Sequence, residues 1–244
     1  STVARELAYH LHMRYGLKIG MIMLEEAPRK TLRDIMSIHL CQPLHLTWGE
    51  RAKELVREHY GEVFGNGGFL LYDHFGSIES DNLLDKIRYM IVSCGCDFVV
   101  LDHITIAVTA MDEGARDERT TIDRLMTQLR SLTEETGAGL IVISHLRKTD
   151  NKSCPFEQGG AISMDDLRGS GSLKQLPDTI IAIERNQQTE AGDERDVLRL
   201  RVLKCRFTGD TGLADKVHFN KKTNRLEPLD PLDTQKGEKD ECPF

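Results

Sequence analysis

Two apolar runs in the sequence each end at a polar side chain that could bind a ligand or a metal. Asp102 directly follows the run 98–101, and His145 closely follows the run 140–143. Short apolar runs of this kind are typical of strands that are covered on both faces, as in a parallel sheet. Ligands of open α/β sheets bind just beyond the carboxyl ends of the strands. The two side chains therefore predict a site at one edge of a sheet.

The first two residues are similar to the end of a phosphate-binding loop. Ser1 and Thr2 stand directly before a helical pattern of apolar residues, where the motif G-x-x-x-x-G-K-[ST] would place its last hydroxyl residue. An ordinary helix-capping serine is the alternative. Because the glycines and the lysine of such a loop are not in the chain, we expect a fragment of a longer protein that does not hydrolyse ATP by itself.

The composition predicts a soluble α/β domain with a short tail. The 244 residues are 39% hydrophobic and 29% charged, which suffices for one large core. A net charge of -7 argues against nucleic acid binding over the whole surface but allows local basic patches. The six cysteines are scattered without a Cys-x-x-Cys pair, which favours a reducing compartment over a zinc or disulfide framework. No apolar run approaches the roughly 20 residues that span a membrane.

Strand and helix patterns alternate along most of the chain, which predicts a mostly parallel sheet flanked by helices. The predicted strands are 18–24, 69–72, 98–102, 140–144, 178–184, 197–206 and 216–220, of which the last two form an antiparallel edge. The predicted helices are 47–64 with Thr47 as its cap, 80–94 ending at Gly95, and 118–136 ending at Gly137. The irregular segments 109–117 and 146–163 are long enough to be functional or disordered. The composition of 230–244 indicates a disordered acidic tail.

Five sequence motifs narrow this class to one family. They are LEE at 24–26, LDH at 101–103, DDLRGSGSLKQLPD at 165–178, ERNQQ at 184–188 and KCRFTGDTG at 204–212. Together they resemble the helicase domain of replicative hexameric DNA helicases, and most of all the bacteriophage primase–helicase and mitochondrial Twinkle branch of the DnaB superfamily. The resemblance extends in uninterrupted order from Ser1 to about Pro228. It implies a RecA-like P-loop NTPase core over 1–229, followed by the tail.

The resemblance assigns the residues that would act on the nucleotide. Ser1 and Thr2 would close the phosphate-binding loop, and Ser1 would hold Mg²⁺ together with Asp102. Glu25 is similar to the catalytic glutamate that orients the attacking water. Glu26 is the alternative, because adjacent strand residues point to opposite faces and only one can address the water; the motif order favours Glu25. Without the resemblance, a carboxylate at a strand end is as often a helix cap.

The resemblance also assigns a sensor and two contacts to the base. His145 matches the sensor that follows the state of the γ-phosphate, although a histidine in such a place is more often a core residue. His103 is interpreted as structural. Arg185 and Phe219 resemble the pair that holds the nucleotide base between them, and Phe219 could equally be core packing. Planar groups stack on any base, so broad nucleotide tolerance is expected, with ATP or dTTP as the nucleotide.

Two basic residues near the end of the strand 197–206 are expected to act on a neighbouring subunit. Arg206 resembles the arginine finger that reaches the ATP site of the next subunit, and Lys204 would be a second contact in trans. The alternative is that the alternating basic residues of this strand face solvent. That alternative is the interpretation for Arg199 and Arg201.

Three loops of the family contact single-stranded DNA in the central channel of the hexamer. In this chain they correspond to 109–117, 146–163 and 168–174. The residues expected to contact DNA are Arg147, Lys148, Lys152, Arg168, Gly169, Ser170 and Lys174. Contacts of this type bind phosphates without regard to sequence, as translocation requires. A solvated basic surface is the alternative.

The function implied is that of the C-terminal domain of a ring helicase, which couples NTP hydrolysis to 5′-to-3′ translocation on DNA and to duplex unwinding. A RecA-type recombinase or clock-type ATPase is one alternative, and a catalytically inactive DNA-binding fragment is another. The tail, which ends in Phe244, would dock the replicative DNA polymerase or serve only for solubility. The expected location is the cytoplasm of a phage-infected bacterium, with the mitochondrial matrix as the alternative.

Overall fold

The structure is a computed structural model that describes residues 2–73, 80–110, 118–147, 154–168, 171–192 and 194–229. The chain divides into two compact units. The first comprises Ser1–His145, Arg168–Leu176 and Lys222–Asn224, and the second comprises Leu146–Leu167, Pro177–Lys221 and Arg225–Phe244. Several predicted features lie outside the described residues, namely Ser1, Lys148, Lys152, Gly169, Ser170 and the tail 230–244.

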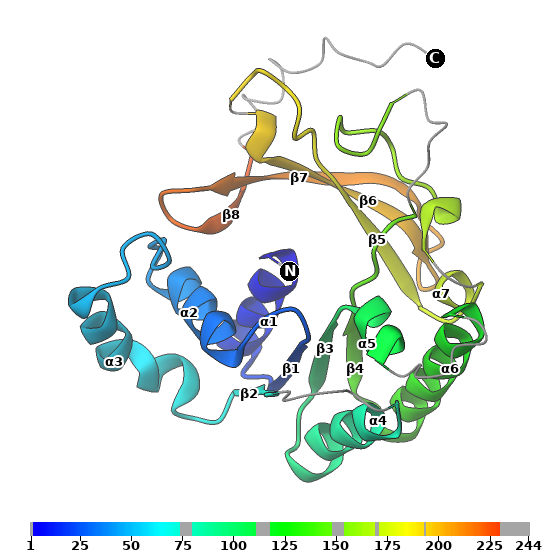
Figure 1. Ribbon diagram of the computed structural model, residues 1–244, viewed down its shortest axis with the longest axis horizontal. Helices are drawn as coiled ribbons and strands as arrows, with labels where there is room; N and C mark the ends of the chain where they lie inside the picture. Colours follow the sequence, from blue (N-terminus) through cyan, green and yellow to red (C-terminus); the bar gives the residue numbers. More distant parts are fainter. Residues whose placement is uncertain are drawn as a thin grey trace. The chain divides into compact units, whose positions relative to one another are not determined.

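Four short strands of the first unit form a parallel sheet in the order β2-β1-β3-β4 (Figure 1). They are β1 Ile19–Met23, β2 Phe69–Leu71, β3 Phe98–Asp102 and β4 Gly139–Val142. The predicted strands are confirmed, with shifts of one or two residues at their ends. Met23 lies beside Asp102 in the register of β1 and β3. The residues after β1 and at the end of β3 therefore share one edge of the sheet.

Helices cover both faces of this sheet. They are α1 Thr2–Tyr15, α2 Pro28–His39, α3 Glu50–Phe64, α4 Ser80–Arg88 with a π-helical turn Tyr89–Ser93, α5 Ile104–Ala110, α6 Glu118–Thr136 and the short α7 Ser172–Gln175. Met21 and Val100 pack against α1, α2 and α3, whereas Ile22 and Leu101 pack against α4, α5 and α6. This division follows from the alternation of side chains along a strand.

The predicted helix ends agree with the structure better than the predicted helix starts do. Gly95 and Gly137 adopt φ values of +71° and +72°, the left-handed conformation that ends a helix. The prediction of Thr47 as a cap is wrong, because α3 begins at Glu50 after Gly49 in extended backbone. The helices α2 and α5 are not among the predicted elements. Pro28 suits the first turn of α2, where its missing N–H is not needed.

The second unit holds an antiparallel sheet in the order β5-β6-β7-β8. Its strands are β5 Thr179–Glu184, β6 Val197–Cys205, β7 Gly212–Asn220 and β8 Arg225–Pro228, with 3-10 turns at Met164–Asp166 and Glu194–Asp196. The predicted antiparallel pairing of β6 with β7 is confirmed, and β5 and β8 extend it into a sheet of its own. The described parts of 146–163 contain turns and isolated bridges in place of helix or strand.

Candidate nucleotide-hydrolysis site

The carboxyl ends of β1, β3 and β4 bring together three residues that the sequence singled out. Glu25 follows β1 by two residues, Asp102 ends β3, and His145 follows β4 by three residues. The backbone N–H of Leu24 donates to the Asp102 carbonyl at 2.7 Å, which continues the pairing of β1 with β3 beyond the strands. Asp102 itself is buried. We refer to Glu25, Asp102, His103 and His145 as the strand-end cluster.

His103 connects the other members of the strand-end cluster. Its Nε2 lies 3.0 Å from Glu25 Oε1, and its ring centroid lies 3.8 Å from that of His145. The His103 side chain is 5% exposed and its Nδ1 has no hydrogen-bond partner among the described residues, whereas the Glu25 side chain is 51% exposed. A buried imidazole thus holds a carboxylate that faces solvent. The sequence-based interpretation of His103 as merely structural missed this contact, although its place directly after Asp102 was a signal.

The surroundings of His145 favour its neutral form. Partial burial is the largest cause that lowers its pKa, and the adjacent His103 lowers the pKa further. The charges of Glu25 and Asp102 act in the opposite direction and do not cancel these effects, while Arg168 adds to the lowering. A neutral imidazole has one donor and one acceptor nitrogen, and its N–H can donate to a phosphate oxygen.

The neighbouring carboxylate, Glu26, has a different environment. Arg5 donates to both of its oxygens at 2.5 and 2.6 Å, Thr31 donates at 2.8 Å, and Lys30 also donates to it. Burial acts to raise the pKa of Glu26, but the hydrogen bonds from Lys30 and Arg5 outweigh it and lower the pKa below its ordinary value. Its oxygens are therefore occupied by fixed cations. Of the two glutamates, Glu25 is the one with a solvent-facing carboxylate beside Asp102.

The predicted arginine finger lies at the end of β6 in the second unit. Arg206 Nη1 lies 3.3 Å from Asp178 Oδ1, and its backbone N–H donates to the Asp178 carbonyl at 2.8 Å. About half of the Arg206 side chain is exposed, and Lys204 is partly buried. The role of both residues toward another subunit stays a prediction.

The sequence-based interpretation that Arg199 and Arg201 of β6 simply face solvent is wrong. Arg201 Nε donates to Glu184 Oε1 at 2.6 Å, and Arg199 Nε lies 3.8 Å from the other oxygen of that carboxylate. The Glu184 side chain is 1% exposed. A buried carboxylate needs a compensating charge, so Arg199 and Arg201 serve the fold of the second unit.

The residues predicted to hold the base belong to one end of the antiparallel sheet. Arg185 directly follows β5 and donates to Asp196 Oδ1 at 3.1 Å, as well as to the Arg195 carbonyl. Lys221 pairs with the other oxygen of Asp196 and follows Phe219 by two residues. Phe219 is partly buried on β7, opposite Leu226 of β8. Their stacking on a base stays a prediction.

Three of the predicted DNA contacts are described by the structure. Arg147 is exposed, and its guanidinium donates to the Asp165 carbonyl at 3.0 Å. Arg168 is exposed, and its backbone N–H donates to the His145 carbonyl at 3.2 Å. Lys174 lies in α7 and is partly buried. The bond from Arg168 to His145 joins the predicted sensor directly to the start of a predicted DNA-contacting segment.

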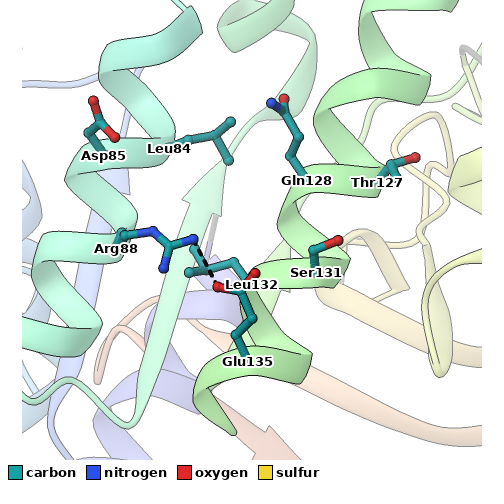
Figure 2. A pocket seen from close by; sticks show the side chains of 8 residues that line it. All are labelled: Leu84, Asp85, Arg88, Thr127, Gln128, Ser131, Leu132 and Glu135. Atoms are coloured by element: carbon teal, nitrogen blue, oxygen red, sulfur yellow. Dashed lines mark hydrogen bonds and ion pairs between the residues drawn. The ribbon is translucent and has the colours of Figure 1, made fainter.

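A cavity of about 400 Å³ opens on the first unit between α4 and α6 (Figure 2). Its lining is mixed, with apolar Leu84 and Leu132 beside an ion pair of 2.9 Å between Arg88 and Glu135. No member of the strand-end cluster lines it. Its position therefore gives no support for a role in nucleotide chemistry.

None of the helices within the described residues is long and apolar enough to cross a membrane.

Solved structures share the fold of this chain at low sequence identity. One of them, an isolated ATPase domain, matches with a TM-score of 0.75 and 16% identity over 94% of this chain and 80% of that one. A DnaB-like replicative helicase, solved in a study of its interactions with primase, matches at 0.70 with 15% identity over 94% and 54% of the two chains. A KaiC-like protein of Pyrococcus horikoshii matches at 0.58 with 16% identity over 94% and 83%. The predicted RecA-like α/β fold is thereby confirmed, but the fold alone does not separate helicases from clock-type ATPases.

Sequence comparison separates the helicase family from the clock-type ATPases for this chain. The DNA helicase/primase of Enterobacteria phage T3 is 45% identical over 234 residues, which are 93% of this chain and 40% of that protein. The chain therefore spans less than half the length of this relative. The family model of the DnaB-like helicase C-terminal domain matches residues 50–228. The resemblance inferred from the five motifs is confirmed, and the chain belongs to the family of the DnaB-like helicase C-terminal domain.

Proposed function

We propose that the protein containing this chain is an NTP-driven replicative DNA helicase, which translocates along single-stranded DNA and separates the duplex. The observation that carries the proposal is the strand-end cluster. It sets a solvent-facing carboxylate, Glu25, beside a buried one, Asp102, on adjacent parallel strands of a domain of this family. Acidic groups at such an edge suit the binding and activation of water and metal in phosphoryl transfer.

The donor set of this edge fits Mg²⁺, which prefers oxygen ligands. Asp102 and the hydroxyl of Ser1 would hold the ion, and Thr2 would lie beside the phosphates at the start of α1. When bound, Mg²⁺ neutralises charge on the β- and γ-phosphates. The nucleotide is proposed to be ATP or dTTP, with its base held by Arg185 and Phe219.

Within this site, Glu25 orients and polarises the attacking water. His103 positions the Glu25 carboxylate through the contact of 3.0 Å, and its burial keeps that contact fixed. His145 senses the γ-phosphate and transmits its loss through its backbone bond to Arg168. Arg206 and Lys204 complete the site from the neighbouring subunit of a hexamer.

Single-stranded DNA is the proposed polymer substrate. Arg147, Arg168 and Lys174 would contact its phosphates, together with four residues of the same segments, namely Lys148, Lys152, Gly169 and Ser170. The acidic tail 230–244 is proposed to dock a replicative DNA polymerase. The proposed place of action is the cytoplasm of a phage-infected cell, in keeping with the phage T3 relative.

The test is Glu25→Gln in the full-length protein, with Glu26→Gln as the matched control. Loss of the water-orienting charge is expected to reduce steady-state NTP hydrolysis by at least about 100-fold, while nucleotide binding is retained. Glu26→Gln is expected to keep most hydrolysis, because its oxygens already serve Arg5 and Lys30. Hydrolysis is measured with and without single-stranded DNA, and unwinding is measured on a forked duplex.

Near-normal hydrolysis by Glu25→Gln together with loss in Glu26→Gln would transfer the role to Glu26. A wild-type protein that hydrolyses NTP and forms filaments or double rings, but does not separate the forked duplex, would favour the recombinase or clock-type alternative.

A further inference from the structure

A second cluster of potential metal ligands lies in the first unit where the end of α2 meets α3. His39 is the last residue of α2, while His59 and Glu62 are three residues apart on α3 and so lie on one face of that helix. One ligand atom from each of the three residues lies within 4.8 Å of the other two. Imidazole nitrogens and a carboxylate oxygen are the ligands that Zn²⁺ takes in proteins.

The Glu62 carboxylate lies between the two rings. Its Oε2 is 3.1 Å from His39 Nε2, and its Oε1 is 2.9 Å from His59 Nδ1. The two ring centroids are 5.9 Å apart. Zn²⁺ in tetrahedral geometry holds neighbouring nitrogen and oxygen ligands about 3.3 Å apart. The two nitrogen–oxygen separations differ from this value by a few tenths of an ångström, and the ligand atoms of all three residues lie within 4.8 Å of one another.

Burial divides the cluster into one fixed and two adjustable ligands. The His39 side chain is 12% exposed, whereas those of His59 and Glu62 are 38% and 56% exposed.

Tyr9 of α1 supplies independent support for a metal site at this cluster. Its hydroxyl lies 2.9 Å from His39 Nδ1, the ring nitrogen that points away from Glu62. In the metal-free chain Nε2 can donate to Glu62, whereas with an ion bound the proton would lie on Nδ1 and be donated to the tyrosine oxygen, so that the lone pair of Nε2 faces the ion. Histidines that bind metals are commonly oriented by such a bond at the second nitrogen. An exposed His–Glu ion pair would not require this support.

We propose that His39, His59 and Glu62 form a binding site for a divalent transition-metal ion of the Zn²⁺ type, which ties the end of α2 to α3. Solvent would complete the coordination, as in other sites with three protein ligands. The bound ion closes the segment 40–49 into a loop fixed at both ends and stabilises the packing of α3. The site is separate from the strand-end cluster, and none of its residues belongs to the proposed reaction.

The experiment titrates Zn²⁺ alone into the 244-residue chain after removal of metals with a chelator, and follows binding by calorimetry. His59→Gln and Glu62→Gln are each expected to abolish binding of one ion per chain. Tyr9→Phe, which removes only the orienting hydroxyl, is expected to weaken that ion by about 10- to 100-fold. His10→Gln, at an exposed histidine next to Tyr9, is the matched control and should bind as the wild type does.

A second readout is thermal unfolding, because a ligand that binds only the folded state raises Tm. Zn²⁺ should raise the Tm of the wild type and of His10→Gln but not that of His59→Gln. Unchanged Zn²⁺ affinity in both His59→Gln and Glu62→Gln would overturn the proposal. The same holds if only His145→Gln loses the ion, since Glu25, His103 and His145 also place ligand atoms within 4.8 Å of one another.

Discussion

At the scale of single residues, the end of β1 places two adjacent carboxylates in different environments. The Glu26 side chain is 9% exposed and belongs to a network with Arg5, Lys30 and Thr31 that joins α1 to the start of α2. The Glu25 carboxylate reaches solvent and lies 3.0 Å from Nε2 of His103, which directly follows the neighbouring strand β3. Substitution of Glu26 is therefore expected to affect mainly stability, and substitution of Glu25 mainly hydrolysis.

Glu26→Gln is predicted to lower the free energy of unfolding by about 1 to 3 kcal/mol at pH 7, because it leaves the buried Arg5 with a weaker partner. Asp34, at 3.4 Å from Arg5, limits the loss. The pKa of Glu26 is lower in the folded chain than its ordinary value of 4.5, so its stabilisation is complete above about pH 4.5 and is lost as the pH falls through the folded pKa.

Urea unfolding of the wild type and Glu26→Gln between pH 7 and pH 3 measures this effect. The gap between the two proteins should narrow as the solution is acidified below pH 4.5. A gap that stays constant over this range would contradict the assigned role of the charge.

At the scale of elements, the packing of α1 beside the edge strand β2 requires glycine, which has no side chain, at position 68. A Cβ there would lie 1.8 Å from the Cε1 atom of the His12 ring. His12 is buried, and its Nδ1 lies 2.9 Å from the Leu17 carbonyl, so the ring is held in place. The Gly68 carbonyl also accepts from the Ile19 N–H at 2.8 Å, which fixes the backbone beside β1.

Gly68→Ala is predicted to destabilise the chain by about 1 to 3 kcal/mol, because either the ring or the strand must move. Gly61→Ala is the matched control, since a Cβ at that position of α3 meets nothing within 4 Å. The control should gain about 0.5 to 1 kcal/mol from the helix propensity of alanine. Equal urea midpoints for the two variants would refute the steric account of Gly68.

At the scale of the whole molecule, the proposed reaction site is incomplete in one chain. The strand-end cluster contains no arginine, and Arg206 lies in the second unit at the end of β6 with about half of its side chain exposed. An exposed guanidinium suits delivery to the charge that develops on a phosphate of another subunit.

Arg206→Ala is accordingly predicted to abolish NTP hydrolysis in rings of the full-length protein while leaving nucleotide binding nearly intact. Rings that mix this variant with Glu25→Gln should regain activity, because about a quarter of the interfaces in a random equal mixture would pair an intact Glu25 with an intact Arg206. Hydrolysis is measured against the mixing ratio. A mixture as inactive as either variant alone would remove the support for a role in trans.

The sequence by itself determined the features that depend on local pattern. Apolar runs located the strands that end near Asp102 and His145, of which β3 is largely buried and the edge strand β4 is partly buried. The glycines 95 and 137 marked helix ends through their left-handed backbone. The five motifs identified the family, because motifs are read along the chain and need no knowledge of packing. The starts of helices were harder to predict. Pro28 opens α2 and Gly49 precedes α3, and neither helix start has a capping side chain.

Only the tertiary structure decided which side chains meet across long separations. The contact of His103 with Glu25 spans 78 residues, and that of His39 with Glu62 spans 23. Arg5 likewise approaches Glu26 from α1, a contact that the sequence does not reveal. Such contacts are set by how helices pack on the sheet and on one another, and local periodicity carries no information about that packing. For this reason the sequence located the edge that holds the strand-end cluster, while the structure assigned the partner of each side chain within it.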